Sequence, residues 1–268
     1  MSSDRPVAIV SGAARGIGAA SAHRLAARGF TVALVDLPTD PGLRDAIPGP
    51  YRHATGADLD IATAACGGHG EAHSADVRDA AELAQVVASV LERHGRIDAV
   101  VAAAGAVAGG APVWETDDDT WRAMIDINLT GVFNLARAVL PAMVDAPEPR
   151  MGRFVAIASA AAHHGLPQMA AYSAAKHGVA GLVRALAAEL GSSGVTANAV
   201  APGSTDTEML RASAAIYGLD SVEGFVDQAR IGRLIEPDEI AATIEWLCVD
   251  APGSLTGAII DVNGGFRA

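Results

Sequence analysis

The chain has 268 residues, a length that suits one large α/β domain or two small ones. Half of its residues are hydrophobic, which is ample material for a core, and its formal net charge of −12 argues against nucleic acid and anionic membrane surfaces as partners. Its two cysteines provide no disulfide framework, and no apolar run reaches the ~20 residues of a membrane span. Its N-terminus leads directly into a predicted strand. We therefore expect a cytoplasmic protein without a signal peptide.

Short apolar runs alternate with segments of helical periodicity along the whole chain. The predicted strands are 7–10, 31–35, 71–75, 97–102, 154–158, 195–200 and 258–262. The predicted helices are 16–28, 80–94, 120–144 (opened by a capping box of Thr116 and Asp119), 172–190 and 237–247. This alternation predicts a single domain over residues 1–268, an α/β fold with a Rossmann-type, doubly wound parallel sheet and helices on both faces.

Two segments between these elements carry functional expectations. Residues 37–57 contain several prolines and glycines and are longer than one connection requires, so we predict an inserted loop of functional importance. A disordered surface loop would have the same composition. Residues 207–231 are apolar with few charges, and we predict that they form a lid over a hydrophobic substrate, although helical packing within the segment would produce the same pattern.

Three glycines stand between the first predicted strand and the helix that follows it. Gly12, Gly16 and Gly18 allow a tight turn and let the backbone approach a pyrophosphate, which a helix N-terminus also attracts. Asp36 ends the second strand, where a carboxylate binds ribose hydroxyls and repels a 2′-phosphate, so the sequence favours NAD over NADP. Arg15 weakly opposes this preference, but a solvated arginine at the start of a helix explains its presence better than phosphate recognition does.

Tyr172 and Lys176 are four residues apart on a predicted helix and therefore share one face. A nearby ammonium lowers the pKa of a phenol from about 10 toward neutrality, which makes Tyr172 a candidate general acid and base. Ser159 can hold a substrate oxygen, and Asn128 can hold a water that passes the proton on. Because a tyrosine and a lysine at this spacing are common on surface helices, the candidate catalytic site depends on all four residues.

With these four residues and the stretch Ser11-Gly-Ala-Ala-Arg-Gly-Ile-Gly18, the chain resembles the short-chain dehydrogenase/reductase family from about Pro6 to its C-terminus. The resemblance implies an NAD-dependent oxidoreductase that interconverts a hydrophobic secondary alcohol and a ketone, and a homotetramer that associates through the two long helices and the last strand. It places the following residues at the cofactor: Gly12, Arg15, Gly16, Ile17, Gly18, Asp36, Leu37, Asp76, Val77, Ala103, Gly105, Tyr172, Lys176, Pro202, Gly203, Thr205 and Thr207. Asp76 could also be the N-cap of the helix at 80–94, and the two roles are compatible. The stretch Ala102-Ala-Ala-Gly105 departs from the family's Asn-Asn-Ala-Gly, so side chains that ordinarily stabilise the sheet there are missing.

Four segments resemble one branch of the family more specifically: the inserted loop, the Ala-Ala-Ala-Gly stretch, Val113-Trp-Glu115 and the turn at Gly203-Ser-Thr205. These resemble the mycofactocin-associated branch of the family, which implies an NAD that does not exchange, a peptide-derived redox carrier that receives the hydride, and residues 37–57 as a cofactor clamp. One alternative is an ordinary reductase with exchangeable NAD(P)H, such as a 3-oxoacyl carrier-protein reductase, which Asp36 and the acidic surface disfavour. The other is a non-catalytic nucleotide-binding regulator, which the complete catalytic set disfavours.

A group of possible metal ligands precedes the helix at 80–94. Cys66, His69, His73 and Asp76 have a spacing that could suggest zinc, but the glycines among them fit a turn better, and we assign no metal. His163 and His164 follow Ser159 closely, and they either line the substrate pocket or lie exposed in a loop.

Overall fold

A computed structural model describes residues 5–37, 51–148 and 151–267. Its centre is a sheet of seven parallel strands in the order β3-β2-β1-β4-β5-β6-β7. The strands are β1 Val7–Ser11, β2 Thr31–Asp36, β3 Gly70–Ser74, β4 Ala99–Ala102, β5 Arg153–Ile157, β6 Thr196–Pro202 and β7 Ile259–Val262. Each predicted strand is therefore present, with bounds that differ by one or two residues.

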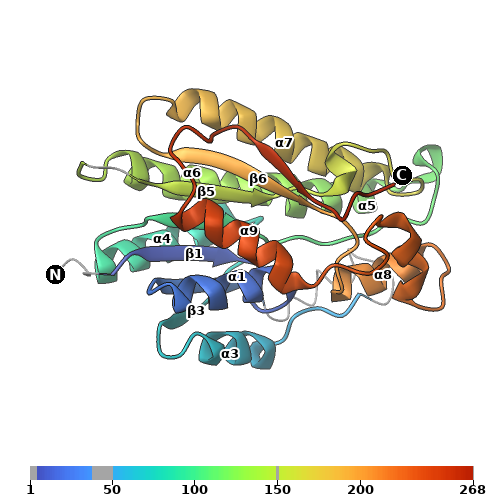
Figure 1. Ribbon diagram of the computed structural model, residues 1–268, viewed down its shortest axis with the longest axis horizontal. Helices are drawn as coiled ribbons and strands as arrows, with labels where there is room; N and C mark the ends of the chain where they lie inside the picture. Colours follow the sequence, from blue (N-terminus) through green and yellow to red (C-terminus); the bar gives the residue numbers. More distant parts are fainter. Residues whose placement is uncertain (1–4, 38–50, 149–150, 268) are drawn as a thin grey trace.

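Helices cover both faces of this sheet (Figure 1). The α-helices are α1 Gly16–Ala27, α3 Gly56–Ala65, α4 Ala80–His94, α5 Asp118–Ile125, α6 Gly131–Val144, α7 Ala170–Leu190, α8 Glu208–Ile216 and α9 Pro237–Val249. Shorter helical turns are η1 Val113–Glu115, η2 Asp126–Thr130, η3 Ala160–Ala162 and η4 Val222–Gln228. The single-domain, doubly wound α/β fold that the sequence predicts is confirmed.

Two hydrophobic cores lie on opposite faces of the sheet. One core includes Leu83 of α4, Val139 of α6 and Val183 of α7, all of which are fully buried or nearly so. The other joins α1, α3 and α9, with Leu25 and Ile244 completely buried. Strands buried on both faces carry continuous apolar runs, which is why β1, β4 and β5 do not alternate polar and apolar residues.

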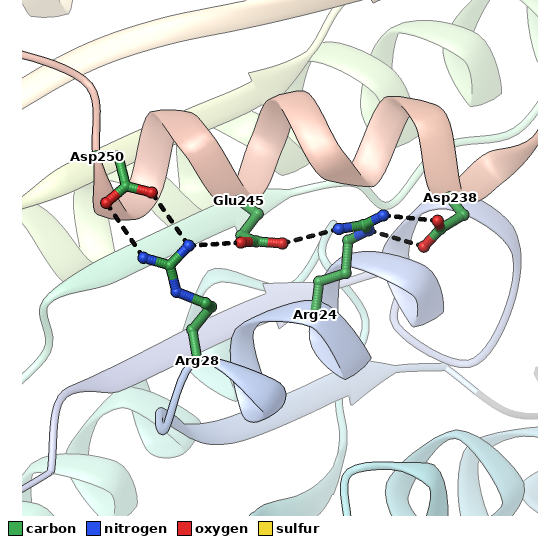
Figure 2. A network of polar contacts seen from close by, with 5 residues as sticks. All are labelled: Arg24, Arg28, Asp238, Glu245 and Asp250. Atoms are coloured by element: carbon green, nitrogen blue, oxygen red, sulfur yellow. Dashed lines mark hydrogen bonds and ion pairs between the residues drawn. The ribbon is translucent and has the colours of Figure 1, made fainter.

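Helices α1 and α9 lie side by side, and an ion-pair network joins their outer surfaces (Figure 2). Glu245 of α9 accepts hydrogen bonds from Arg24 of α1 (2.9 Å) and from Arg28 (2.8 Å), the residue that follows α1. Arg24 also binds Asp238 through two bonds, and Arg28 binds Asp250. Because α1 begins at the glycine turn, this network helps to hold the helix whose N-terminus faces the predicted cofactor site.

The long helix predicted at 120–144 is present, but its start and its middle differ from expectation. Asp117 is the N-cap and accepts a bond from the Thr120 amide at 2.7 Å, so the predicted capping box of Thr116 and Asp119 is wrong. The π-helical turn η2 separates α5 from α6. By length and composition the run Asp118–Val144 could cross a membrane, but 56% of its most apolar window is buried within the protein, and core helices pass the same test.

The two segments with functional expectations are only partly as predicted. Of the predicted loop 37–57, residues 38–50 lie outside the described part of the chain. The loop also ends earlier than expected, because Thr55 and Asp58 form a capping box that starts α3 at Gly56. The segment 207–231 contains α8 and η4, which pack on each other through Leu210 and Phe225. Helical packing therefore accounts for part of its apolar pattern.

Candidate active site

One pocket gathers nearly all the predicted site residues at the carboxyl ends of the strands. The strand order reverses between β1 and β4, and ligands of open α/β sheets bind in the crevice at this point. The predicted residues that line the pocket are Gly12, Arg15, Gly16, Ile17, Gly18, Asp36, Leu37, Asp76, Val77, Ala103, Gly105, Ser159, Tyr172, Lys176, Pro202, Gly203, Thr205 and Thr207. Asn128 does not line it and lies buried behind it.

The turn between β1 and α1 requires glycine for steric reasons. Gly12 has a φ of 66°, and a Cβ there would lie 2.6 Å from the backbone of Ala104. A Cβ on Gly18 would lie 2.1 Å from the carbonyl oxygen of Gly12. Gly16 has a φ of 54°, and a Cβ there would lie 3.3 Å from the methyl group of Thr207. The turn is therefore as tight as predicted, and it leaves the N-terminus of α1 open to a bound group.

Asp36 combines a structural role with its position at the pocket. Its two carboxylate oxygens accept the amides of Ala14 and Leu37, each at 2.8 Å, which fixes the glycine turn against the end of β2. Burial raises the pKa of this carboxyl group, while the two amide bonds oppose the rise. Each carboxylate oxygen can accept a further bond, so Asp36 can still hold ribose hydroxyls.

Arg15 does not behave as a solvated arginine. Its Nη1 is shielded from solvent and has no hydrogen-bond partner among the described residues, and its guanidinium lies 5.8 Å from the centre of the Tyr51 ring. A buried donor without a partner is costly, so its presence in a pocket indicates that an anionic group completes it. This donor, the glycine turn and Asp36 fit a dinucleotide with an unmodified ribose.

The segment after β3 is fixed by α6. Asp76 accepts a bond from Arg78 Nε at 2.7 Å, and Asn134 donates to the carbonyls of Val77 and Arg78 at 3.1 Å. The N-cap of α4 is Asp79, so the prediction that Asp76 caps this helix is wrong. Asp76 forms a side-chain pair with Arg78 instead, and both line the pocket. The sequence analysis did not identify Asn134, which holds this backbone in place.

The chain at the end of β4 lacks the asparagines of the family pattern, and Ser11 supplies part of the hydrogen bonding there. The backbone amide of Ala104 donates to the Ser11 hydroxyl at 3.3 Å, and the amide of Ala103 donates to the Ser11 carbonyl at 3.2 Å. Gly105 follows, and a Cβ there would lie 2.9 Å from Asn128 Oδ1 and 3.8 Å from Lys176 Nζ. Backbone and a small residue therefore form the pocket wall next to the catalytic candidates.

Tyr172, Lys176 and Ser159 meet in the pocket, but their electrostatics differ from the prediction. Burial raises the pKa of Tyr172, and a hydrogen bond with Ser159 opposes the rise. Burial also lowers the pKa of Lys176 to about 8. Lys176 Nζ donates to the carbonyl of Ile157 at 2.8 Å and lies 5.7 Å from the centre of the Tyr172 ring. The prediction that Lys176 brings the pKa of Tyr172 toward neutrality is thus wrong for this state, because loss of hydration dominates.

Asn128 is completely buried in the π-helical turn between α5 and α6. Its amide nitrogen donates to the carbonyls of Ala106 and Met124, both at 3.0 Å, and its oxygen accepts the amide of Ala106 at 3.2 Å. The side chain therefore anchors the chain that follows Gly105. Both side-chain donors are used for this purpose, which leaves only acceptor capacity for a water molecule.

The chain after β6 forms the remaining wall. Gly203 must be small, since a Cβ there would lie 2.6 Å from the carbonyl oxygen of Asn263. Thr205 bridges to Ile235, and the Thr207 hydroxyl accepts the amide of Leu210 at 3.3 Å as the N-cap of α8. Pro202 through Thr207 thus connect the sheet to the predicted lid.

Several lining residues were not identified from the sequence. They include Tyr51, His53, Arg78, Leu166, Met169, Gln228 and Phe266. The chain has three tyrosines, and all of them line this pocket. Phe266 lines the pocket near the C-terminus of the chain, and its ring lies tilted against that of His164 with ring centres 5.7 Å apart.

The sequence could also suggest a metal site at Cys66 and His69, and a pocket role for His163 and His164. In the described part of the chain, no three residues of the types His, Cys, Asp and Glu are grouped so that they could hold a metal. Cys66 is buried in the core beside α3, and His69 contacts Arg5. His163 and His164 are not among the described residues that line the pocket, and His163 lies 3.5 Å from Asp261.

The fold and the pocket together define a dinucleotide-dependent oxidoreductase. Residues 12–267 match a protein family described as enoyl-(acyl carrier protein) reductase. The chain is 36% identical to an uncharacterised NAD-dependent oxidoreductase of Mycobacterium tuberculosis (97% of this chain, 94% of the relative). It is 38% identical to a 3-oxoacyl-[acyl-carrier-protein] reductase of Synechocystis (97% and 96%). A solved structure of carveol dehydrogenase from Mycobacterium avium in complex with NAD superposes with a TM-score of 0.87 at 30% identity (97% and 96%).

The chain belongs to the short-chain dehydrogenase/reductase family. It is an oxidoreductase that acts on CH–OH groups, and its cofactor is NAD. This agrees with the observations at the pocket, where a carboxylate stands at the end of β2 and the glycine turn precedes α1.

Proposed function

We propose that this protein is an NAD-dependent dehydrogenase of hydrophobic secondary alcohols, which can also reduce the corresponding ketones. The main support for the proposal is that apolar and charged side chains line different parts of the pocket. Beyond Ser159 and Tyr172 the wall is formed by apolar side chains: Leu166, Met169, Met209, Tyr217, Phe225 and Phe266. Among the described lining residues, the arginines and lysines are Arg15, Arg78 and Lys176, which stand at the glycine turn, after β3 and beside Tyr172. An uncharged substrate suits the apolar end.

In this proposal the protein's own groups bind the alcohol and move its proton. The Ser159 hydroxyl holds the substrate oxygen, and Tyr172, which lines the same pocket, accepts the hydroxyl proton. Lys176 and Asn128 fix the surrounding backbone at Ile157 and Ala106. NAD, when bound, supplies the ring that accepts the hydride.

We assign the cofactor contacts to the predicted residues that line the other half of the pocket. The glycine turn and Arg15 would hold the pyrophosphate, because backbone amides at a helix N-terminus and the shielded Nη1 donor of Arg15 both favour an anion. Asp36 would hold the adenosine ribose. Pro202, Gly203, Thr205 and Thr207, which the family resemblance places at the nicotinamide end and the phosphates, all line the pocket and would hold that part of the cofactor.

Two tyrosine variants of the same pocket test the catalytic assignment. Tyr172→Phe should lose at least about 10²–10⁴-fold in kcat for alcohol oxidation, the contribution of positioned acid–base groups. Tyr217→Phe is the matched control, since the Tyr217 hydroxyl lines the same pocket but donates to the carbonyl of Pro167 at 2.9 Å. Near-normal turnover by Tyr172→Phe would end the assignment, and an equal loss in both variants would mean that the pocket, not the phenol, was damaged.

We further propose that the NAD of this protein exchanges slowly and passes its hydride to a peptide-derived carrier of the mycofactocin type. The support is that the segment between β2 and α3 places Tyr51 and His53 in the pocket, although most of the predicted clamp lies outside the described residues. Native mass spectrometry of extensively desalted protein, followed by incubation with excess isotope-labelled NAD, tests this. One retained, unlabelled NAD(H) per chain supports slow exchange, and empty or fully labelled protein refutes it.

The second candidate is a reductase with exchangeable NAD(P)H that acts on 3-oxoacyl groups of a carrier protein. It is favoured by the 38% identity to the Synechocystis enzyme. An acidic carrier would need basic residues near the entrance, and a chain with a net charge of −12 is a poor partner for it. Rapid exchange of labelled NAD together with turnover of an acetoacetyl thioester would favour this candidate.

A homotetramer is also proposed, as the family resemblance implies. On α6, Phe133 is 44% exposed and carries Arg137 over its ring. On α7, small residues such as Ala174, Gly181 and Ala185 are exposed and would let another helix approach closely. Light scattering of the purified protein distinguishes a tetramer from a monomer or dimer.

A further inference from the structure

Tyr51 is a pocket residue that comes from an unexpected part of the chain. It stands in the segment between β2 and α3, yet it packs against the cluster that contains Met169 and Tyr172. Met209, which belongs to α8, packs against the same cluster. A single side chain therefore links the segment that follows the ribose-binding strand to the wall of the predicted substrate site.

The segment around Tyr51 is fixed by local bonds. Thr55 and Asp58 form the capping box of α3, and Arg52 pairs with Asp58 at 2.8 Å. Ala54 is 8% exposed and is part of the core between the sheet and α3. These contacts fix residues 52–55 on α3 and the core beside it. The backbone next to Tyr51 is therefore held in place, and its side chain lines the pocket.

Three groups meet the Tyr51 side chain inside the pocket. Its hydroxyl donates to the carbonyl of Gly105 at 3.4 Å, its ring lies under the guanidinium of Arg15, and the ring of His53 meets it edge-on at 5.3 Å. Gly105 is next to the catalytic candidates, because a Cβ at that position would lie 3.5 Å from Met209 Cε and 3.8 Å from Lys176 Nζ. Tyr51 thus lies at the junction between the cofactor half and the apolar half of the pocket.

We propose that Tyr51 is a specificity-determining residue whose ring forms the substrate-pocket wall on the side of the cofactor groove and selects bulky cyclic alcohols over small ones. The proposal rests on the proposed function, since it takes the substrate to be an uncharged alcohol held at Ser159 and Tyr172. A tyrosine ring presents a large, rigid apolar face, and the methionines beside it adapt to the shape of a ring-shaped ligand. A small alcohol has no ring to pack on this face, so its binding gains little from it.

The test compares two substrates in three variants. Menthol serves as the bulky cyclic alcohol and isopropanol as the small one, and KM and kcat are measured for both with added NAD. Tyr51→Ala removes the ring, and Tyr51→Phe keeps it while removing the bond to Gly105. Arg52→Ala is the matched control, because Arg52 is exposed and disturbs the same segment without lining the pocket.

We expect Tyr51→Ala to lower the menthol-to-isopropanol ratio of kcat/KM by about tenfold or more, which is the discrimination that apolar pockets achieve by shape. Most of the loss should come from a higher KM for menthol. Tyr51→Phe and Arg52→Ala should keep the ratio of the wild type. An unchanged ratio in Tyr51→Ala, or an equal fall in Arg52→Ala, overturns the proposal. The binding of NADH, followed by its fluorescence, is measured in every variant to show that the cofactor half is intact.

The two proposals fail in different ways. If the wild-type chain oxidises neither alcohol, whether NAD or an artificial electron acceptor is supplied, the proposed function is wrong, and calorimetric titration of the NADH-loaded protein with menthol then tests Tyr51 directly. If only Tyr51→Ala binds menthol more weakly, the result supports the proposal that the Tyr51 ring forms the pocket wall. Equal binding in all variants refutes that proposal. If the wild type binds no menthol at all, both proposals are overturned.

Discussion

Lys176 gives a prediction about stability that is separate from its place in the active site. The residue is 3% exposed, and burial lowers its pKa from 10.5 to about 8. At about 1.4 kcal/mol for each pH unit, this fall means that folding disfavours the charged ammonium by about 3 kcal/mol. Below about pH 8 the side chain is charged in both the folded and the unfolded chain, so the folded protein bears the whole cost. As the pH rises from about 8 toward 10.5, the folded chain gives up this proton first, and the cost disappears.

We therefore expect Lys176→Met to be more stable than the wild type at about pH 7, although it should lose activity. Removing the charge gains about 3 kcal/mol, but the carbonyl of Ile157 loses the donor that lies 2.8 Å away, which costs about 1–2 kcal/mol. The net gain of about 1–2 kcal/mol corresponds to a few degrees in the unfolding midpoint for a domain of this size.

Thermal unfolding of cofactor-stripped protein measures this difference. Both chains must be compared at one protein concentration, because ligand and subunit binding shift the midpoint by mass action. The advantage of Lys176→Met should shrink as the pH is raised to about 10. A variant that is less stable at neutral pH, or whose advantage grows with pH, would refute the reasoning.

Three further predictions follow from named contacts. In cofactor-stripped protein the phenol of Tyr172 should ionise above the ordinary tyrosine pKa, because burial disfavours the phenolate. The ultraviolet difference titration of wild type against Tyr172→Phe measures this ionisation. Ionisation near neutral pH would contradict the prediction. Glu245→Gln should weaken the pairs with Arg24 and Arg28 and cost about 1 kcal/mol in urea unfolding, less at high salt; a salt-independent loss would point to packing instead of charge. Gly18→Ala should abolish NADH binding, because its Cβ would lie 2.1 Å from a backbone oxygen; normal binding, followed by fluorescence, would show that the turn can relax.

The sheet and most of its helices could be predicted because their signals are local. Strand β1 is a run of buried apolar residues that ends in a glycine, and α4 carries Leu83, Val86, Val87 and Val90 on one buried stripe. The pocket residues at strand ends were equally accessible, because parallel strands bring their carboxyl ends to one edge. Asp36 and Ser159 are examples, since each follows or ends a strand and each lines the pocket.

The errors arose where two local choices compete or where contacts are long-range. Thr116 and Asp117 are both N-cap residue types, and the structure uses Asp117, whose side chain bonds both the amide and the hydroxyl of Thr120. Tyr51 could not be placed because nothing in the sequence near it indicates that it reaches Gly105, which lies 54 positions further along the chain. Its placement depends on the anchoring of α3, which is a tertiary property.

The electrostatics of Tyr172 and Lys176 show why spacing alone does not give a pKa. The four-residue separation places both side chains on one helix face, as predicted, but the ammonium turns to the carbonyl of Ile157 instead of the phenol oxygen. Burial then favours the neutral form of each group, so it raises the pKa of Tyr172 and lowers that of Lys176. A positive charge brought close to Tyr172, such as that of an oxidised nicotinamide ring, would shift the balance toward the phenolate by simple Coulombic attraction. The proton-accepting form of the site would therefore be favoured when the oxidised cofactor is bound, which keeps the base inactive in its absence.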